Sequence, residues 1–196
     1  TGKTLLAQAI HNSSQRACGP FISFNAAAMS DTLLESQLFG HEKGAFTGAD
    51  RPLRGRFELA HGGTLFFDEM ADMSPLAQAK ILRAIEYGEF ERLGSERVRH
   101  ANVRIISATN VSLRERIRRG LFREDLYQRL NGLTLVIPPL RERQEDISKL
   151  AHFFIGNFNQ EFKKSVQGIS EEALVLLKRY SWPGNIRELR NVIERI

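Results

Sequence analysis

Apolar and polar positions along the first two thirds of the chain follow two different periods. Short, mostly apolar runs bounded by glycine, proline or polar residues predict four strands, at 21–24, 64–67, 103–108 and 133–137. Between them, apolar residues spaced three and four apart predict helices that begin near Lys3, Asp31 and Pro75. Apolar strands that alternate with helices are typical of a parallel sheet covered by helices on both faces. The sequence therefore predicts a three-layer α/β fold.

The pattern changes after Pro138-Pro139. No further strand-like run follows, and helical spacing dominates, as in Ile147, Leu150, Ala151 and Phe154. We expect two domains, an α/β domain over residues 1–140 and a small all-helical domain over residues 141–196. The chain begins at Thr1 and stops inside its last predicted helix, as expected for a piece of a longer protein.

Composition narrows the class of protein. With 42% hydrophobic and 26% charged residues, the 196-residue chain is typical of globular proteins, and no apolar run approaches the length of a membrane span. The single cysteine, Cys18, excludes an internal disulfide framework and a multi-cysteine zinc site. Because no secretory signal is visible, a reducing, cytoplasmic location is expected.

The net charge of +5 is concentrated in one segment. Between Ser95 and Arg123 there are eight arginines and two glutamates, so this window alone carries a charge of +6. No aromatic residue is interleaved until Phe122, which disfavours base stacking and favours binding of phosphate or another anion. For Arg97 and Arg99 we expect a solvated surface.

Polar residues follow three of the predicted strands. Asp68 and Glu69 come directly after strand 64–67, and ligands of open α/β sheets bind at such strand ends. Asp68 is placed to hold Mg²⁺ and Glu69 to orient or deprotonate an attacking water, unless the pair only begins a helix. Asn25 and Thr109-Asn110 end two other strands, where they either position water and sense a phosphate or form a turn.

Gly2-Lys3-Thr4 opens the first predicted helix and matches the end of a phosphate-binding loop. In such loops the backbone N–H groups hold the phosphates, the lysine reaches the β- and γ-oxygens, and the threonine ligates Mg²⁺. Taken alone, the tripeptide is better explained as an ordinary helix start. The acidic pair that begins 65 residues after Lys3 makes nucleotide binding the favoured interpretation.

The segment 44–49, Gly-Ala-Phe-Thr-Gly-Ala, shows neither period. Phe46 stands there among glycines and small residues. A large aromatic residue on such a loop is either a contact residue or a core residue held in a turn, and the residues alone leave both interpretations open.

These segments together resemble the AAA+ domain of sigma-54-dependent transcriptional activators, the NtrC-like bacterial enhancer-binding proteins. The hexapeptide at 44–49 is a highly specific signature of that family. Similar segments follow in the same order over most of the chain, at 62–69, 105–110, 122–130, 138–143 and 182–189. The resemblance implies a P-loop AAA+ fold with a helical lid, ATP and Mg²⁺ as cofactors, and ATP hydrolysis in a homo-oligomeric ring, expected to be a hexamer.

The resemblance also implies partners. The motor remodels the closed complex of the sigma-54 RNA polymerase holoenzyme in the bacterial cytoplasm, without a membrane. DNA is bound through a C-terminal domain that lies outside this chain, and the regulatory domain, of the two-component response-regulator type, lies outside it as well. Phe46 and Thr47 match the loop tip that touches sigma-54.

Within the nucleotide site, the resemblance assigns the residues nearest ATP. Gly2, Lys3 and Thr4 match the end of the Walker A motif, with Thr4 also a ligand of Mg²⁺. Asp68 and Glu69 match Walker B, in which Asp68 holds Mg²⁺ and Glu69 activates water. The family more often has glutamate where Thr4 stands, and the first strand and most of Walker A lie outside the chain.

Five further residues match positions that sense or complete the nucleotide site. Asn25 matches the asparagine that restrains the Walker B glutamate, and Asn110 falls in sensor I. Arg123 and Arg129 match the arginine fingers that reach a neighbouring subunit's nucleotide. Arg187 matches sensor II in the lid.

Two other classes of protein stay open. Another AAA+ remodelling ATPase would share the fold but would not need Phe46 and Thr47 in a glycine-rich tip. A regulator that keeps the fold but has lost hydrolysis is the second, and the intact Lys3, Asp68, Glu69 and both arginine fingers disfavour it.

Overall fold

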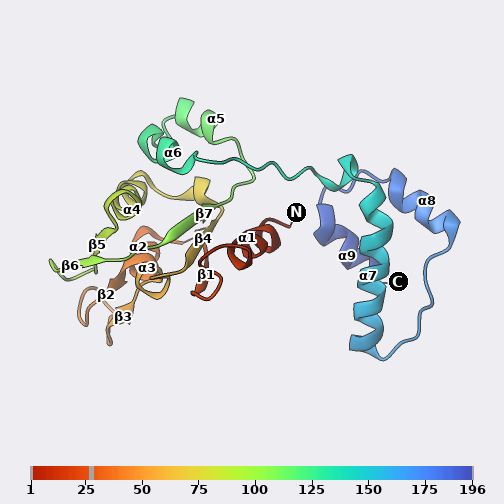
Figure 1. Cartoon of the computed structure of the whole chain (residues 1–196), viewed down its shortest axis with the longest axis horizontal. Coiled ribbons are helices and arrows are strands. Elements are labelled where there is room, and N and C mark those ends of the chain that lie inside the picture. Colours follow the sequence, from red (N-terminus) through yellow and green to blue (C-terminus); the bar gives the residue numbers. More distant parts are fainter. Residues whose placement is uncertain (1, 27–28, 196) are drawn as a thin grey trace. The chain divides into compact units, whose positions relative to one another are not determined.

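The computed structural model describes residues 2–26 and 29–195 (Figure 1). Contacts between residues divide the chain into two compact units. The sheet unit comprises residues 4–134, and the helical unit comprises residues 135–196 together with residues 1–3. Each unit has a hydrophobic core of its own, so each is described by itself.

A three-stranded parallel sheet forms the centre of the sheet unit. Its strands are β1 (Phe21–Asn25), β4 (Thr64–Asp68) and β7 (Arg104–Ser107), in the order β1-β4-β7. The first four residues of β4 are buried, the pattern of a central strand that pairs on both edges. The predicted α/β fold is confirmed, and these three strands lie within one residue of the bounds that the sequence indicates.

Helices and two short hairpins surround this sheet. The longer helices are α1 (Lys3–Asn12), α2 (Asp31–Phe39) and α4 (Pro75–Tyr87). Shorter elements are α3 (Arg56–Leu59), α5 (Leu113–Arg118), α6 (Glu124–Leu130) and the 3₁₀ turn η1 (Met70–Asp72). Strands β2 (Gly40–His41) and β3 (Leu53–Arg54) pair antiparallel, as do β5 (Glu89–Glu91) and β6 (Val98–His100).

Local sequence explains where α4 begins. Ser74 precedes the helix in extended conformation, and its hydroxyl accepts a hydrogen bond from the Ala77 N–H. Pro75 occupies the first helical position, where its missing N–H costs nothing. The helix ends at Gly88, whose φ of 70° is the left-handed conformation that glycine adopts without strain.

Helix α1 is anchored to the amino end of the sheet. Near the end of α1, the buried His11 is hydrogen-bonded through Nδ1 to the Thr64 hydroxyl at the start of β4, 2.9 Å away. Arg16 follows α1 and donates to the carbonyl oxygens of Gly63 and Asn102, each 3.1 Å away. These bonds set where β4 and β7 begin and therefore, at fixed strand length, where they end.

The strand predicted over residues 133–137 is wrong. The segment is irregular, and Leu133, Leu135 and Val136 are 82%, 55% and 85% exposed. An apolar run forms a strand only when a neighbour takes up its backbone hydrogen bonds. None of the described strands pairs with this segment, so its apolar character alone does not make it a strand.

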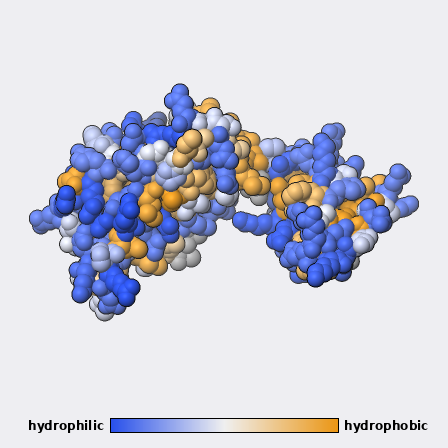
Figure 2. Space-filling model, turned by 60° about the horizontal axis from the view of Figure 1, so that its bottom comes forward, coloured by the Kyte–Doolittle hydropathy of each residue, from blue (hydrophilic) through white to orange (hydrophobic). Residues whose placement is uncertain are grey.

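The helical unit packs three helices around a small core. They are α7 (Glu145–Phe162), α8 (Glu171–Arg179) and α9 (Asn185–Arg195), preceded by the 3₁₀ turn η2 (Leu140–Glu142). Trp182 is 2% exposed, and its indole N–H donates to the Leu177 carbonyl oxygen over 2.7 Å. Hydrophilic residues cover much of the visible face of each unit, with hydrophobic residues exposed among them (Figure 2). None of the described helices is long and apolar enough to cross a membrane.

Close backbone approach at the entry to β4 generates a stability prediction. A Cβ atom on Gly63 would overlap the Pro20 carbonyl oxygen, whereas one on the exposed Gly132 would meet nothing within 4 Å. Overpacking of this kind costs about 1–3 kcal/mol. Gly63→Ala should therefore lower the free energy of unfolding by about that amount in urea titrations, and Gly132→Ala should leave it within about 0.5 kcal/mol of the parent. Equal effects of the two changes would contradict the packing seen at Gly63.

Candidate functional site

The carboxyl ends of the three parallel strands meet at one edge of the sheet. Asn25 of β1 is in register with Asp68 of β4, and the Ala26 N–H donates to the Asp68 carbonyl oxygen over 3.2 Å. On the other side of β4, the Ala108 N–H donates to the Phe67 carbonyl oxygen over 2.8 Å. Three strands far apart in sequence thus deliver Asn25, Asp68 and the polar pair after Ala108 to the same edge.

Glu69 leaves this edge in a strained conformation. Its φ and ψ of 56° and 44° lie in the left-handed region, which a residue with a Cβ adopts at a cost of about 1–3 kcal/mol. The buried Met70 and Ala71 hold the turn η1 that follows, and the Asp72 N–H donates to the Glu69 carbonyl oxygen. Strain of this kind is typical of functional sites, where surrounding packing fixes a side chain in a direction that the free backbone would not choose.

Thr109 and Asn110 behave differently at the end of β7. The Val111 N–H donates to the Thr109 hydroxyl over 3.1 Å, so Thr109 closes a turn. Asn110 is exposed beyond that turn, at the edge that Asp68 shares. The turn interpretation therefore describes Thr109, whereas the Asn110 side chain is exposed to solvent.

The start of α1 has the features of an anion site. Gly2 has a φ of 92°, Lys3 is the first helical residue, and Thr4 is exposed. No acidic residue occupies the first turn, and the positive end of the helix dipole lies there. Within the described ranges, no cluster of three or more His, Cys, Asp or Glu side chains could hold a metal ion. Mg²⁺ does not require one, because it is commonly bound by one or two protein ligands together with phosphate oxygens.

Arg123 precedes α6, Arg129 lies in its last turn, and both are exposed, while Phe122 and Leu126 are buried in the core. The Arg123 guanidinium forms a two-pronged pair with Asp125, with Nε–Oδ1 at 3.0 Å and Nη2–Oδ2 at 2.6 Å. This hydrogen-bonded pair lowers the pKa of the Asp125 carboxyl. The apolar spacing therefore places both arginines on the surface, as the sequence predicts.

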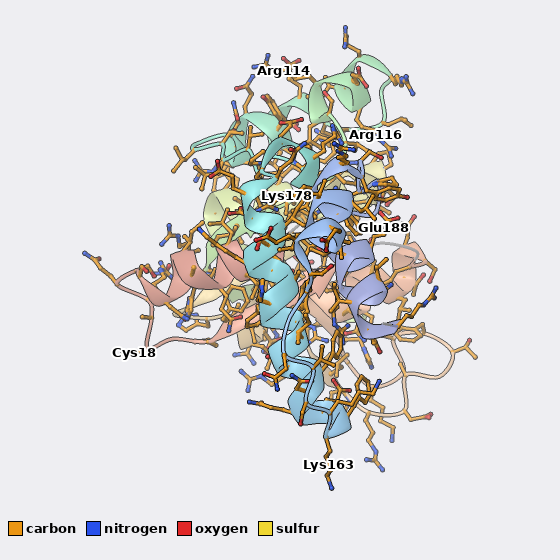
Figure 3. The ribbon with its side chains drawn as sticks, turned by 90° about the vertical axis from the view of Figure 1, so that its right-hand side faces the viewer. Cys18, Arg114, Arg116, Lys163, Lys178 and Glu188 are labelled. Atoms are coloured by element: carbon orange, nitrogen blue, oxygen red, sulfur yellow. The ribbon has the colours of Figure 1, made fainter. Side chains whose placement is uncertain are left out.

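Arg187 is exposed on α9 of the helical unit. Two side chains of α9 hold the start of this helix. Asn185 accepts a hydrogen bond from the Leu140 N–H over 2.8 Å, and Glu188 accepts one from the Gly184 N–H over 2.9 Å. Glu188, labelled in Figure 3, also accepts the Tyr180 hydroxyl. Arg187 thus projects from a helix start whose backbone is fixed to the 3₁₀ turn η2.

The loop at 44–49 is a closed turn. The Gly44 N–H donates to the Ala49 carbonyl oxygen over 2.8 Å, and Gly44 and Gly48 have φ values of 82° and 96° that favour glycine. Phe46 is half-buried, with its ring centroid 5.0 Å from that of His41 in an edge-on arrangement, and lies outside the buried core of the sheet unit. Thr47 at the tip is exposed.

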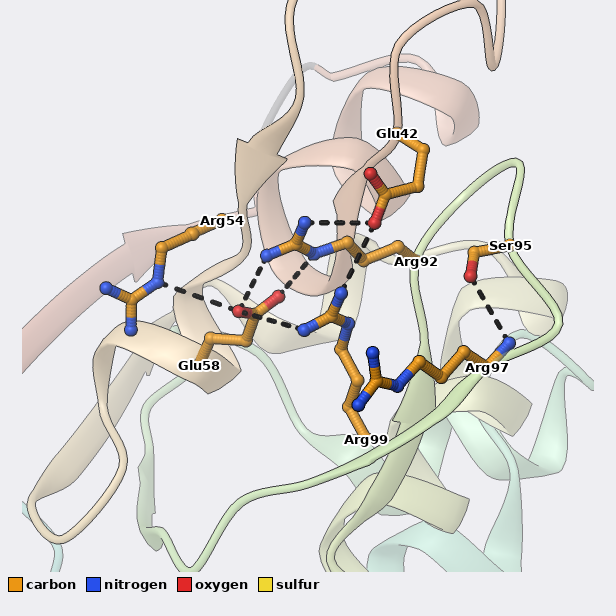
Figure 4. Close-up of polar contacts among 7 residues, drawn as sticks. All are labelled: Glu42, Arg54, Glu58, Arg92, Ser95, Arg97 and Arg99. Carbon is orange, nitrogen blue, oxygen red and sulfur yellow. Dashed lines mark hydrogen bonds and ion pairs between the residues drawn. The ribbon is translucent and has the colours of Figure 1, made fainter.

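A cluster of ion pairs holds the base of this loop (Figure 4). Arg92 grips Glu58 of α3 with two hydrogen bonds of 2.7 and 2.8 Å and reaches Glu42, next to the loop, over 3.0 Å. Arg99 of β6 contacts the same two glutamates at 3.3 and 3.8 Å. The Arg92 and Glu58 side chains are only 11% and 10% exposed. We call Glu42, Glu58, Arg92 and Arg99 the loop-base cluster.

Charges within the loop-base cluster shift the pKa of Glu58. Burial acts to raise it, but the hydrogen bonds and charge of Arg92, aided by Arg99 and Arg54, outweigh burial and hold the pKa below its ordinary value. The solvated surface predicted for Arg99 is wrong, because Arg99 forms ion pairs with Glu42 and Glu58. Arg97 is exposed as predicted. The sequence carries no signal for these pairs, because the partners are 34 to 57 positions apart.

Other arginines of the basic segment also have partners. Arg116 of α5 pairs with Asp72 of η1 over 3.0 Å, and Arg114 donates to the Tyr127 hydroxyl over 3.3 Å. Figure 3 labels both arginines. Arg116 thereby links the basic segment to the turn that follows Glu69.

Two family models match the chain. The model described as the Sigma-54 interaction domain matches residues 1–136, and the one described as the AAA+ ATPase lid domain matches residues 141–196.

Relatives and solved structures point the same way. The Nif-specific regulatory protein of Klebsiella pneumoniae is 56% identical over 195 residues, covering 100% of this chain and 37% of that protein. The phenol regulator MopR of Acinetobacter guillouiae is 50% identical, covering 99% of this chain and 35% of that protein. Crystal structures of NtrX from Brucella abortus with ADP and with ATP superpose with TM-scores of 0.91 and 0.90 at 42% identity, covering 99% of this chain and 42% and 44% of those chains. The chain thus spans less than half the length of each.

The loop-base cluster generates a stability prediction with a defined pH dependence. Arg92→Met leaves the buried Glu58 without its main partner and should lower the free energy of unfolding by on the order of 3 kcal/mol at neutral pH. Because Arg92 lowers the pKa of Glu58 in the folded state, its stabilisation is present above the ordinary glutamate pKa and is lost as the pH falls through the lowered value.

Urea titrations of parent and variant at several pH values measure this difference. The exposed Arg97→Met on the same hairpin is the matched control and should be near neutral. A loss that persists unchanged in strong acid, or an equal loss in the control, would contradict the assigned role of Arg92.

Proposed function

Because the chain belongs to the Sigma-54 interaction domain family and carries an AAA+ lid domain, we propose that it is the ATP-hydrolysing motor of a sigma-54-dependent transcription activator. The motor remodels the closed complex of sigma-54 RNA polymerase so that promoter DNA opens. Transcription with bacterial RNA polymerase takes place in the cytoplasm, so the proposed function places the protein there.

The observation that carries this proposal is the edge of the sheet at which Asn25 and Asp68 end their strands. Glu69 follows β4, and Asn110 follows β7 after two intervening residues. Glu69 is the proposed base, which orients and deprotonates the water that attacks the γ-phosphate. Asn25, in register with Asp68, is the proposed restraint on Glu69. Asn110 is the proposed sensor of the γ-phosphate, because it is exposed beyond β7 at the same edge.

The start of α1 supports binding of the triphosphate. The backbone N–H groups at Gly2, Lys3 and Thr4 and the Lys3 ammonium would hold the phosphates. Thr4 and Asp68 supply the oxygen ligands that Mg²⁺ prefers, and a bound Mg²⁺ would neutralise charge on the phosphates. The related NtrX was solved with ADP and with ATP, which supports a nucleotide as the ligand.

The two exposed arginines support an assembly that completes the site between subunits. Arg123 and Arg129 are exposed, whereas the apolar residues near them are buried. Both are proposed to stabilise transition-state charge on the nucleotide of a neighbouring subunit. A homo-oligomeric ring, a hexamer in our proposal, supplies such neighbours. Arg187 is the proposed phosphate contact of the lid, from the fixed start of α9.

The loop at 44–49 supports contact with sigma-54. Thr47 is exposed, and Phe46 rests on His41 rather than in the core. The loop-base cluster anchors the loop to α3 and the β5–β6 hairpin, so a movement of those elements would be passed to the tip. Specific DNA binding is assigned to a domain outside this chain.

The proposed roles of Glu69 and Lys3 can be separated in the protein at its full natural length. Glu69→Gln should bind ATP like the parent but lose most turnover, at least about 100-fold, because water activation is lost while Asp68 stays. Lys3→Ala should weaken binding as well, because it removes a phosphate contact. ATP binding and phosphate release are measured side by side, and parent-level hydrolysis by Glu69→Gln would contradict the role of Glu69.

Coupling can be separated from chemistry at the loop. Phe46→Ala and Thr47→Ala should keep ATP turnover within about 2-fold of the parent and abolish open-complex formation at a sigma-54 promoter, because the loop contacts the polymerase and not the nucleotide. Phe153→Ala, the same change at an exposed aromatic residue of α7, should affect neither. Parallel loss of hydrolysis and promoter opening in the loop variants would show instead that Phe46 supports the fold.

A further inference from the structure

Gln78 is a fully buried polar residue in the middle of the sheet unit. It lies in the first turns of α4 and is 0% exposed. All the hydrogen-bonding groups of its amide are used by backbone groups. Nε2 donates to the Met73 carbonyl oxygen over 2.8 Å and to the Leu121 carbonyl oxygen over 3.0 Å, and Oε1 accepts the Arg123 N–H over 2.8 Å.

Those three backbone groups belong to two functional segments. Met73 ends the turn η1 that begins after Glu69. Leu121 and Arg123 bracket the buried Phe122 and lead into α6. A second link runs in parallel, from Arg116 of α5 to Asp72 of η1. The segment that carries Arg123 is therefore bound to the segment that carries Glu69, with Gln78 as the buried part of the connection.

The Gln78 amide fixes the backbone of Arg123, whose side chain lies on the surface. The Arg123 N–H is held by Gln78, and the Arg123 carbonyl oxygen accepts the Tyr127 N–H over 3.1 Å. The guanidinium lies on the surface, 44% exposed, where Asp125 pairs with it. With its backbone held, Arg123 can exchange Asp125 for another anion only by rotation of its side chain. The position of its Cα atom, from which the guanidinium extends, is therefore set by Gln78.

We propose that Gln78 is the positioning residue for Arg123 as an arginine finger that acts on a neighbouring subunit's nucleotide. The proposal rests on the proposed function and adds a residue to it. An apolar residue would fill the same volume at lower cost, since a buried amide stabilises only when every group is paired. Here two of the three bonds, to the Leu121 carbonyl oxygen and the Arg123 N–H, place the backbone at the finger, and the third ties that backbone to Met73 at the end of η1. A subunit with a Gln78 substitution is therefore expected to present a misplaced Arg123 to its neighbour, while its own nucleotide site stays intact.

Mixing of subunits separates these two sites. In the full-length protein, Gln78→Met should bind ATP like the parent and turn it over about 10–100-fold more slowly, because a shift of about 1 Å in a positioned group can cost that much. Mixed with Lys3→Ala after subunit exchange, it should regain turnover, since Lys3→Ala subunits offer well-placed fingers to intact Gln78→Met sites. Mixed with Arg123→Ala it should regain none, since both lack a working finger.

The opposite pattern would overturn the proposal. Recovery with Arg123→Ala and none with Lys3→Ala would show that Gln78 serves its own subunit's site. Gln15→Met, the same change at an exposed position before β1, is the matched control and should behave as the parent. Gln78→Glu is a second variant, which keeps the acceptor for the Arg123 N–H but has at most one donor for the two carbonyl oxygens. The same mixing pattern is expected from it, and failure of both variants to bind ATP would overturn the proposal by making Gln78 a folding residue.

Failure of the inference and failure of the proposed function give different results. If the parent does not hydrolyse ATP, or if Arg123→Ala mixed with Lys3→Ala recovers nothing, the shared site itself is refuted and the proposal falls with it. If those two controls succeed and Gln78→Met turns over ATP at the parent rate, only the role of Gln78 is wrong.

Discussion

The parallel pairing of β4 with β1 on one side and β7 on the other is the constraint on which the site depends. In a parallel sheet all strands end at the same edge, so residues separated by 43 positions, Asn25 and Asp68, come into register. The buried apolar residues of β4 fix that strand in the core, and the His11–Thr64 bond fixes where it begins. The strained backbone at Glu69 persists because buried packing around Met70 holds it.

Buried polar side chains fix the positions of surface segments relative to the sheet. Arg92 and Glu58 are nearly buried, and removing such charges from water costs several kcal/mol per ion unless geometry and hydrogen bonds compensate. Gln78 is buried too, and its amide is fully paired. Each also fixes a segment of backbone, the base of the loop at 44–49 in one case and the residues on either side of the buried Phe122 in the other.

Helix α2 lies along the chain between the end of β1, where Asn25 stands, and the loop at 44–49. The helix follows β1, which ends at Asn25, and stops at Gly40, whose φ of 85° begins the hairpin that carries the loop. Ser36 of α2 is hydrogen-bonded to His41 over 2.8 Å, and His41 in turn supports Phe46. Ser36 and His41 thus link the last turn of α2 to Phe46 of the loop.

Local sequence determined the elements that have strong apolar periodicity or clear start and stop residues. These are the three strands of the sheet and the start of α4 at Ser74-Pro75. Local sequence also determined that Arg123 and Arg129 lie on the surface beside buried apolar residues. It also determined the candidate residues at strand ends, since strand direction alone brings them together. Tertiary structure decided what depends on a partner elsewhere in the chain. The apolar run 133–137 needs a neighbouring strand to become one, and none of the described strands supplies it. Arg99 is expected to be solvated from the sequence, and only the fold places Glu42 and Glu58 beside it. The fold likewise decides that Gln78 is buried against the Arg123 backbone. Periodicity reports which face of an element is apolar, whereas such pairings are set by how distant elements pack.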